Sequence, residues 1–284
     1  MTTRRNKPGG GGRSPLPIGP TALLIGDGDE LAALEPILKA ASMTIVRRQT
    51  DRDEEFDLEA FLVDLEDSFD GPLARTTLAI IAADLLVDAR LDIVNLVDQL
   101  LNPDNPLLVS CTQATATEQA VLCEHPRRVV GFSILGLFAG HQVVEVAPAL
   151  RSDPELTQRV ATLLASGGAT VQQVGDVPGL VLARILAPSV NEAALAVGEG
   201  VGTAEAVDMA MRLGANYPFG PLRLADEVGL HRILLVMEHL ARSLATDRYR
   251  PAPLLRQLAL SGFTGKAAGR GFFTYQDIQP TDDR

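Results

Sequence analysis

Residues 21–46 constrain the fold of this chain more than any other stretch. They read TALLIGDGDELAALEPILKAASMTIV: a short apolar strand, a turn with two glycines, a helix-like stretch and a second short strand around Met43–Val46. This order predicts a strand–helix–strand unit. Further strands are expected at ADLLVDA, NPLLVSC, VVGFSIL and HQVVEVA, and the amphipathic helix LDIVNLVDQLL separates the first two of these. Strands that alternate with helices predict an α/β fold with a doubly wound, mostly parallel sheet.

The pattern changes after GDVPGL, because the rest of the chain contains helical stretches only. These are LVLARILAPSVNEAALAVGEG, TAEAVDMAMRLGA, PLRLADEVGLHRILLVMEHLARSLA and APLLRQLALSG. The first has apolar residues on nearly all sides, including Val181, Ile185 and Val190. That pattern predicts a central, buried helix or one that packs against a partner subunit.

Charge and composition narrow the class of partner. The formal net charge of -11 argues against a nucleic-acid or anionic-membrane surface, so a small molecule or another protein is expected. Two cysteines and four histidines in 284 residues indicate neither a disulfide framework nor a metal site. No apolar run reaches membrane-spanning length and no signal-peptide core is present, which predicts a cytoplasmic protein. Residues 1–19, basic and glycine-rich, are expected to form a disordered tail.

Five segments of the second half stand in an order and spacing similar to those of the 3-hydroxyacyl-CoA dehydrogenase family. They are DVPGLVLARIL, NEAALAVGEG, VDMAMRLGANYPFGPLRLADEVGL, YRPAPLLRQL and GKAAGRGFFTY. The resemblance implies a Rossmann-type NAD-binding domain over residues 20–178 and a helical dimerisation and substrate domain over 179–277, followed by a tail at 278–284. It also implies NAD-dependent interconversion of 3-hydroxyacyl-CoA and 3-oxoacyl-CoA, as in fatty acid metabolism, by a homodimer.

The resemblance also assigns candidate catalytic positions. Glu145 and Ser110 match a glutamate and a serine of the family's active site. The family's catalytic histidine falls on Ser133, and two active-site asparagines fall on Gly136 and Ala183. A serine does not act as a general base near neutral pH without an activating partner, so reduced or absent activity is expected.

The proposed nucleotide turn, GDGDEL, departs from the family pattern too. A dinucleotide fingerprint needs three glycines, and Gly26 and Gly28 supply two while Leu31 stands at the third position. Asp27 and Asp29 place negative charge where a pyrophosphate would bind, and Asp29 is expected to cap the following helix.

Two further positions concern the cofactor. The acidic residue expected to hold the adenosine ribose falls on Gln49, with Asp51 as a substitute. Asp92 stands in for a family glutamate near the nicotinamide. The segment DRDEEFDLEAFLVDLEDSFDG is acidic where the family has basic residues for CoA.

His141 and Glu145 raise a separate question, since an imidazole beside a buried carboxylate suits acid–base chemistry. In an extended strand these residues share one face but lie about 13 Å apart, at roughly 3.3 Å per residue. We therefore expect no dyad, and expect His141 to be partly exposed at the mouth of a strand.

Three functions stay open at this point. The first is a 3-hydroxyacyl-CoA dehydrogenase-like oxidoreductase of reduced or absent activity. The second is a non-catalytic binding or scaffold member of the family. The third is a dehydrogenase of altered substrate, a smaller hydroxy acid, with His141 or another group recruited.

Overall fold

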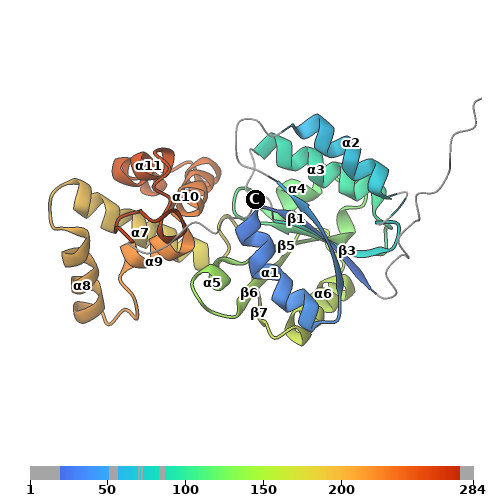
Figure 1. The fold of residues 1–284 in the computed structure, drawn as a ribbon, viewed down its shortest axis with the longest axis horizontal. Helices are drawn as coiled ribbons and strands as arrows, with labels where there is room; N and C mark the ends of the chain where they lie inside the picture. The colour runs from blue at the N-terminus through green and yellow to red at the C-terminus, as the bar shows by residue number, and fades with distance from the viewer. Residues whose placement is uncertain (1–19, 51–56, 70, 72, 83–86, 276–284) are drawn as a thin grey trace, which may run out of the picture.

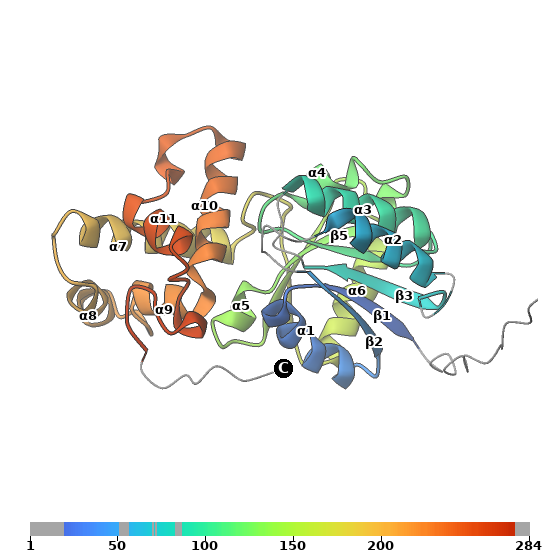
Figure 2. The same ribbon diagram turned by 45° about the horizontal axis from the view of Figure 1, so that its top comes forward.

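The computed structural model describes residues 20–50, 57–69, 71, 73–82 and 87–275. It has two parts, a sheet flanked by helices and a group of helices beside it (Figures 1 and 2). The expected disordered tail and Asp51 lie outside the described residues. None of the helices in the described ranges is long and apolar enough to span a membrane.

The first part is a seven-stranded sheet in the order β2-β1-β3-β4-β5-β6-β7. Every pairing is parallel except that of β5 with β6. The doubly wound, mostly parallel sheet expected from the sequence is therefore confirmed. The strands are β1 Thr21–Gly26, β2 Thr44–Gln49, β3 Thr76–Ile81, β4 Leu107–Ser110, β5 Val129–Ser133, β6 Val143–Pro148 and β7 Thr170–Gln173.

Helices cover both faces of this sheet (Figure 1). On one face α2, α3 and α4 pack on Leu23, Ile25 and their neighbours, and on the other α1 and α6 pack on Leu24, Ile80 and theirs. Side chains of a strand alternate between faces, so each central strand supplies both cores. The helices are α1 Gly28–Ala40, α2 Leu58–Phe69, α3 Val87–Leu100, α4 Ala116–Ala120, α5 Leu135–Phe138 and α6 Pro154–Ser166.

One expected strand is misplaced. The sequence suggested a strand at residues 83–89, but the strand between β1 and β4 is β3, Thr76–Ile81, and α3 already begins at Val87. Residues 83–86 lie outside the described part. A strand buried on both faces is a continuous apolar run, and two such runs follow each other here, so periodicity alone could not choose between them.

The second part is helical, as expected. It contains α7 Leu182–Gly198, α8 Ala204–Gly214, α9 Pro221–Val228, α10 Leu230–Leu244 and α11 Pro253–Leu260. The stretch taken as one long helix is two, because Gly229 has φ of 99° and ends α9. Helix α7 is less buried than its composition suggested: Val190 is buried, whereas Ile185 is 65% exposed.

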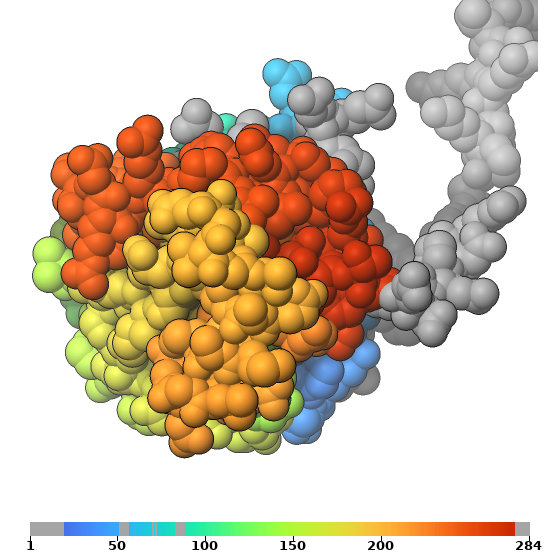
Figure 3. Space-filling model, turned by 90° about the vertical axis from the view of Figure 1, so that its left-hand side faces the viewer, coloured from blue at the N-terminus to red at the C-terminus, as the bar shows by residue number. Residues whose placement is uncertain are grey.

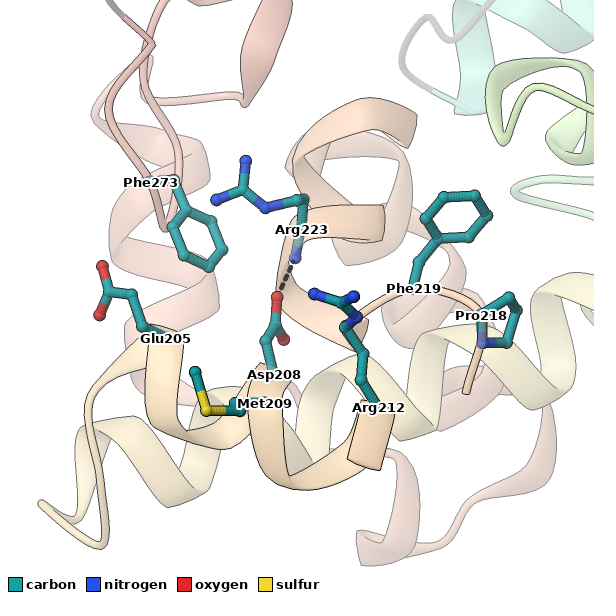
Figure 4. A pocket seen from close by; sticks show the side chains of 9 residues that line it. Glu205, Asp208, Met209, Arg212, Pro218, Phe219, Arg223 and Phe273 are labelled. Atoms are coloured by element: carbon teal, nitrogen blue, oxygen red, sulfur yellow. Dashed lines mark hydrogen bonds between the residues drawn. The ribbon is translucent and has the colours of Figure 1, made fainter. Parts of the chain in front are cut away.

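Three buried polar side chains hold the helical part together. Asn191 donates to the carbonyl of Arg250 and accepts from the amide of Ala252. Asp208 accepts from the amides of Leu222 and Arg223 at the start of α9, a contact visible in Figure 4. A carboxylate at a helix N-terminus satisfies amides that have no partner within the helix.

Asp226 is the third of these residues. It is 1% exposed and accepts from the amides of Phe272 and Phe273 and from the hydroxyl of Tyr275. A Cβ on Gly271 would overlap its carboxylate. The segment GRGFFTY is thus shaped around Asp226.

Candidate active site

Ser133 and Glu145 face each other across the antiparallel pair β5–β6, where they are register partners. Opposite residues of such a pair have Cβ atoms about 4.5–5.5 Å apart. The sheet therefore joins two of the sequence-predicted site residues that stand twelve positions apart in the chain. The Oγ of Ser133 accepts from the amide of Leu135, 3.3 Å away, at the start of α5.

Glu145 is bound at one oxygen. Its Oε1 accepts from the amides of Val181 and Leu182, both at 3.1 Å, so the carboxylate satisfies the N-terminus of α7. Its Oε2 is buried and has no hydrogen-bond partner in the described part of the chain. Burial raises the pKa of Glu145, and the two amides oppose that shift. This carboxylate is thus already engaged in holding the helical part to the sheet.

A small cavity lies between the two parts. It measures about 20 Å³, and its lining includes Ser110, Ser133, Ala183, Glu30 and Arg232. Pockets for small molecules usually measure about 300–1,000 Å³, so this one holds little more than a water molecule. This cavity is too small for a nucleotide or an acyl-CoA ester.

The turn between β1 and α1 is occupied by its own side chains. Asp27 caps α1 by accepting from the amide of Glu30 at 2.9 Å, and Glu30 returns the bond to the amide of Asp27 at 3.1 Å. The cap is Asp27, two residues before the Asp29 expected from the sequence. Glu30 is 3% exposed, and a Cβ on Gly26 would lie 2.9 Å from its Oε2.

Helix α10 presents a polar stripe to the sheet part. Arg232 reaches Asp27 and Asp29, each at 3.5 Å. His239 lies seven residues on, with Nδ1 3.2 Å from the carbonyl of Thr112, and Nη2 of Arg242 donates to the carbonyl of Gln113 at 2.6 Å. Residues seven and three apart share one face of a helix.

Sequence reasoning missed this stripe. Its signal was present as charged and titratable residues recurring at helical spacing within the otherwise apolar LHRILLVMEHLARSL. His239 is 1% exposed, and its Nε2 lies 3.7 Å from Oε2 of Glu118. Burial lowers the pKa of His239, and the Glu118 carboxylate opposes that shift. His239 does not line the cavity, so this pair belongs to the contact between the two parts.

His141 is exposed, two residues before β6, and its amide donates to the carbonyl of Gly136 at 2.9 Å. Glu145 lies inside β6, 5% exposed, with its bound oxygen directed to α7. The expectation of an exposed histidine at the mouth of a strand is confirmed.

Comparison with known proteins identifies the family. The family profile described as 3-hydroxyacyl-CoA dehydrogenase, C-terminal domain, matches residues 179–275. A probable 3-hydroxybutyryl-CoA dehydrogenase of Deinococcus radiodurans is 35% identical over 199 residues, which cover 68% of this chain and 72% of that protein. The chain belongs to the 3-hydroxyacyl-CoA dehydrogenase family.

Other members of the 3-hydroxyacyl-CoA dehydrogenase family are similar as well. A probable 3-hydroxybutyryl-CoA dehydrogenase of Bacillus subtilis is 38% identical over 189 residues, covering 66% of either protein. The crystal structure of (S)-3-hydroxybutyryl-CoA dehydrogenase from Ralstonia eutropha superposes with a TM-score of 0.70 at 26% identity, covering 90% of this chain and 99% of that one. The fold is therefore that of a Rossmann-type domain followed by a helical domain.

The positions carried over from the 3-hydroxyacyl-CoA dehydrogenase family come together only in part. Ser110, Ser133 and Ala183 line the same cavity, and the Oγ of Ser110 lies 3.0 Å from the Oγ1 of Thr112. At Gly136 a Cβ would lie 2.7 Å from the carbonyl oxygen of Val143, so this backbone has no space for a side chain. The cavity thus gathers hydroxyl groups where the resemblance leads us to expect an imidazole and amides.

The NAD that the family implies does not fit the described turn. A pyrophosphate needs free amides and a positive potential at the helix N-terminus. Here Asp27 and Glu30 take up amides, and Asp29 adds further negative charge. Asp92 lies exposed on α3 and is not among the residues that line the cavity. We therefore derive no step through NAD.

The described residues contain no group of three His, Cys, Asp or Glu side chains able to hold a metal ion. Both cysteines are free and buried, and burial raises the pKa of Cys123 to about 12.

Proposed function

We propose that this protein is a 3-hydroxyacyl-CoA dehydrogenase-type oxidoreductase whose turnover is reduced or lost. The observation that carries the proposal is Ser133, which stands opposite Glu145 where the family's catalytic imidazole is expected. The hydroxyl of Ser133 is bound to the amide of Leu135, and nothing that lines the cavity is a histidine. Positioned proton transfer contributes about 10²–10⁴-fold in rate, so its loss alone is severe.

The test is NADH-dependent reduction of acetoacetyl-CoA, measured beside the Bacillus subtilis relative. We expect kcat/KM of this protein to be lower by about a hundredfold or more. Ser133→His alone is expected to recover little, because Gly136 and Ala183 remain and groups that act as a unit are not additive. A wild-type kcat of about 1–10³ per second, the range of ordinary enzymes, overturns the proposal.

A second candidate is a non-catalytic binding or scaffold member of the family. The small cavity beside Ser133 favours it, because about 20 Å³ admits neither a nucleotide nor an acyl-CoA ester. Isothermal titration with acetoacetyl-CoA separates the candidates: saturable binding without turnover supports an acyl-CoA-binding protein, and absence of binding supports a scaffold whose partner is another protein.

We also propose that the chain forms a homodimer through residues 179–277, with 20–178 as the other domain. Helices α7 and α8 expose large apolar side chains: Ile185 is 65%, Met209 59% and Leu213 78% exposed. Figure 3 views the outer side of the helical part, where α8 lies in front. Exposed apolar clusters of this kind mark interfaces. Light scattering is expected to give a dimer for the wild type and a shift toward monomer for Ile185→Glu; a wild-type monomer at micromolar concentration contradicts the proposal.

A further inference from the structure

The side chain of Arg232, on α10, lies against the turn between β1 and α1. It is 5% exposed, and its Nη2 lies 3.5 Å from carboxylate oxygens of both Asp27 and Asp29. Its Nη1 donates to the carbonyl of Val228 at 3.1 Å, and its guanidinium stacks on the ring of Phe138 at 3.9 Å. Segments some two hundred positions apart thus surround one guanidinium.

The turn between β1 and α1 presents the opposite charge to that of a dinucleotide-binding turn. A Rossmann turn that binds a dinucleotide offers amides and the positive end of a helix dipole to a pyrophosphate. This turn offers the carboxylates of Asp27 and Asp29, with Glu30 buried behind them. Carboxylates attract a guanidinium, which binds them in a planar fork, and repel phosphate.

We infer that the dinucleotide turn of this chain is a guanidinium site filled by its own Arg232, so that Arg232, Asp27 and Asp29 determine that the cleft rejects NAD. The guanidinium bridges the helical part to the turn and lines the same small cavity as Ser133. A pyrophosphate would have to displace Arg232 and then lie against the carboxylates of Asp27 and Asp29, which repel it. This inference does not depend on Ser133, because it concerns binding and not proton transfer.

The first experiment is titration of the full-length protein with NADH, followed by nucleotide fluorescence, and with NAD by calorimetry. We expect no saturation up to about 1 mM nucleotide, which corresponds to a binding free energy weaker than about -4 kcal/mol. Saturable micromolar binding overturns the inference. It would leave the proposed loss of turnover intact, since a protein can bind NADH and lack a catalytic base.

The second experiment tests the bridge itself by a double-mutant cycle on melting temperature. Asp27→Asn keeps a good helix cap, and Arg232→Met keeps an unbranched apolar stem, so each removes mainly the charge. We expect the double variant to lose less than the sum of the single losses, because the two residues interact. Arg242→Met is the matched control on the same helix, because Arg242 donates to the carbonyl of Gln113 and not to the turn. The drop in melting temperature from Arg242→Met should therefore add to the drop from Asp27→Asn. Full additivity for Arg232 overturns the inference.

Discussion

The helical part and the cleft beside it use buried polar side chains in contrasting ways. In the helical part, Asn191, Asp208 and Asp226 are each at most 6% exposed, and each binds the backbone of another segment. In the cleft, Glu145 has one oxygen on α7 and one without a hydrogen-bond partner among the described residues, and Ser133 stands where an imidazole is expected. The first set is bonded to its surroundings, whereas the second departs from the catalytic site that the resemblance implies.

The family match lies in the helical part, where the buried polar side chains are bound. The matched range, residues 179–275, contains Asn191, Asp208 and Asp226, and their bonds shape the turns and helix ends of the helical part. A match over residues that organise a fold does not by itself establish the chemistry, so function has to be argued from the cleft.

The largest loss of stability should follow from removing the buried carboxylate of Asp226 in the helical part. Asp226→Ala leaves two amides and one hydroxyl without an acceptor, so we expect a loss of about 3 kcal/mol or more in the free energy of unfolding. Urea unfolding measures it. Asp226→Asn keeps one acceptor oxygen and should lose less.

Glu199→Ala serves as the control for that change, since Glu199 is exposed at the end of α7. Its effect should stay within about 0.5 kcal/mol. Equal losses for the Asp226 and Glu199 variants would show that the buried hydrogen bonds of Asp226 add nothing to the stability of the helical part.

A smaller effect, on the pH dependence of the free energy of unfolding, is expected for Glu145→Gln. Burial raises the pKa of Glu145 above 4.5, so the folded state binds its proton more tightly than the unfolded chain. Stability from this group is therefore present below pH 4.5 and is lost as pH rises through the folded-state pKa. Glu145→Gln removes the titration, so relative to wild type it should gain stability between pH 4 and pH 8 in urea unfolding.

Glu118→Gln gives the opposite sign. Burial acts to raise the pKa of Glu118, but the bonds from Thr115 and the nearby His239 outweigh it, so the pKa is lowered. Its contribution is present above pH 4.5 and is lost as pH falls, so the variant should lose stability relative to wild type as pH rises. Parallel curves for the two variants would contradict the assigned charge states.

The smallest effect is expected at His141. This residue is exposed and lies outside the cavity, so His141→Ala should change neither the melting temperature nor any residual reduction of acetoacetyl-CoA beyond error. Steady-state kinetics at one fixed NADH concentration, the same for both proteins, measure the second quantity. A hundredfold loss would mean that the loop before β6 moves toward Glu145 during turnover.

Much of the fold could be predicted because its signals are local. Strand–helix alternation in the first half and helical periodicity in the second were enough for the two parts and most elements. The strand at Thr76–Ile81 was missed because two apolar runs compete there, and β7 was missed because Thr170–Gln173 is short and polar. Strand geometry predicted the separation of His141 from Glu145, although β6 begins two residues after His141.

The sequence by itself determined the class of fold, the family and the absence of an imidazole at Ser133, because each depends on residue type at a position within one segment. The tertiary structure decided the rest. Only packing brings Arg232 to Asp27, places the amides of α7 against Glu145 and reduces the cavity beside Ser133 to about 20 Å³. These contacts join segments 36 to 205 positions apart, and no local pattern encodes which distant charge a side chain will meet.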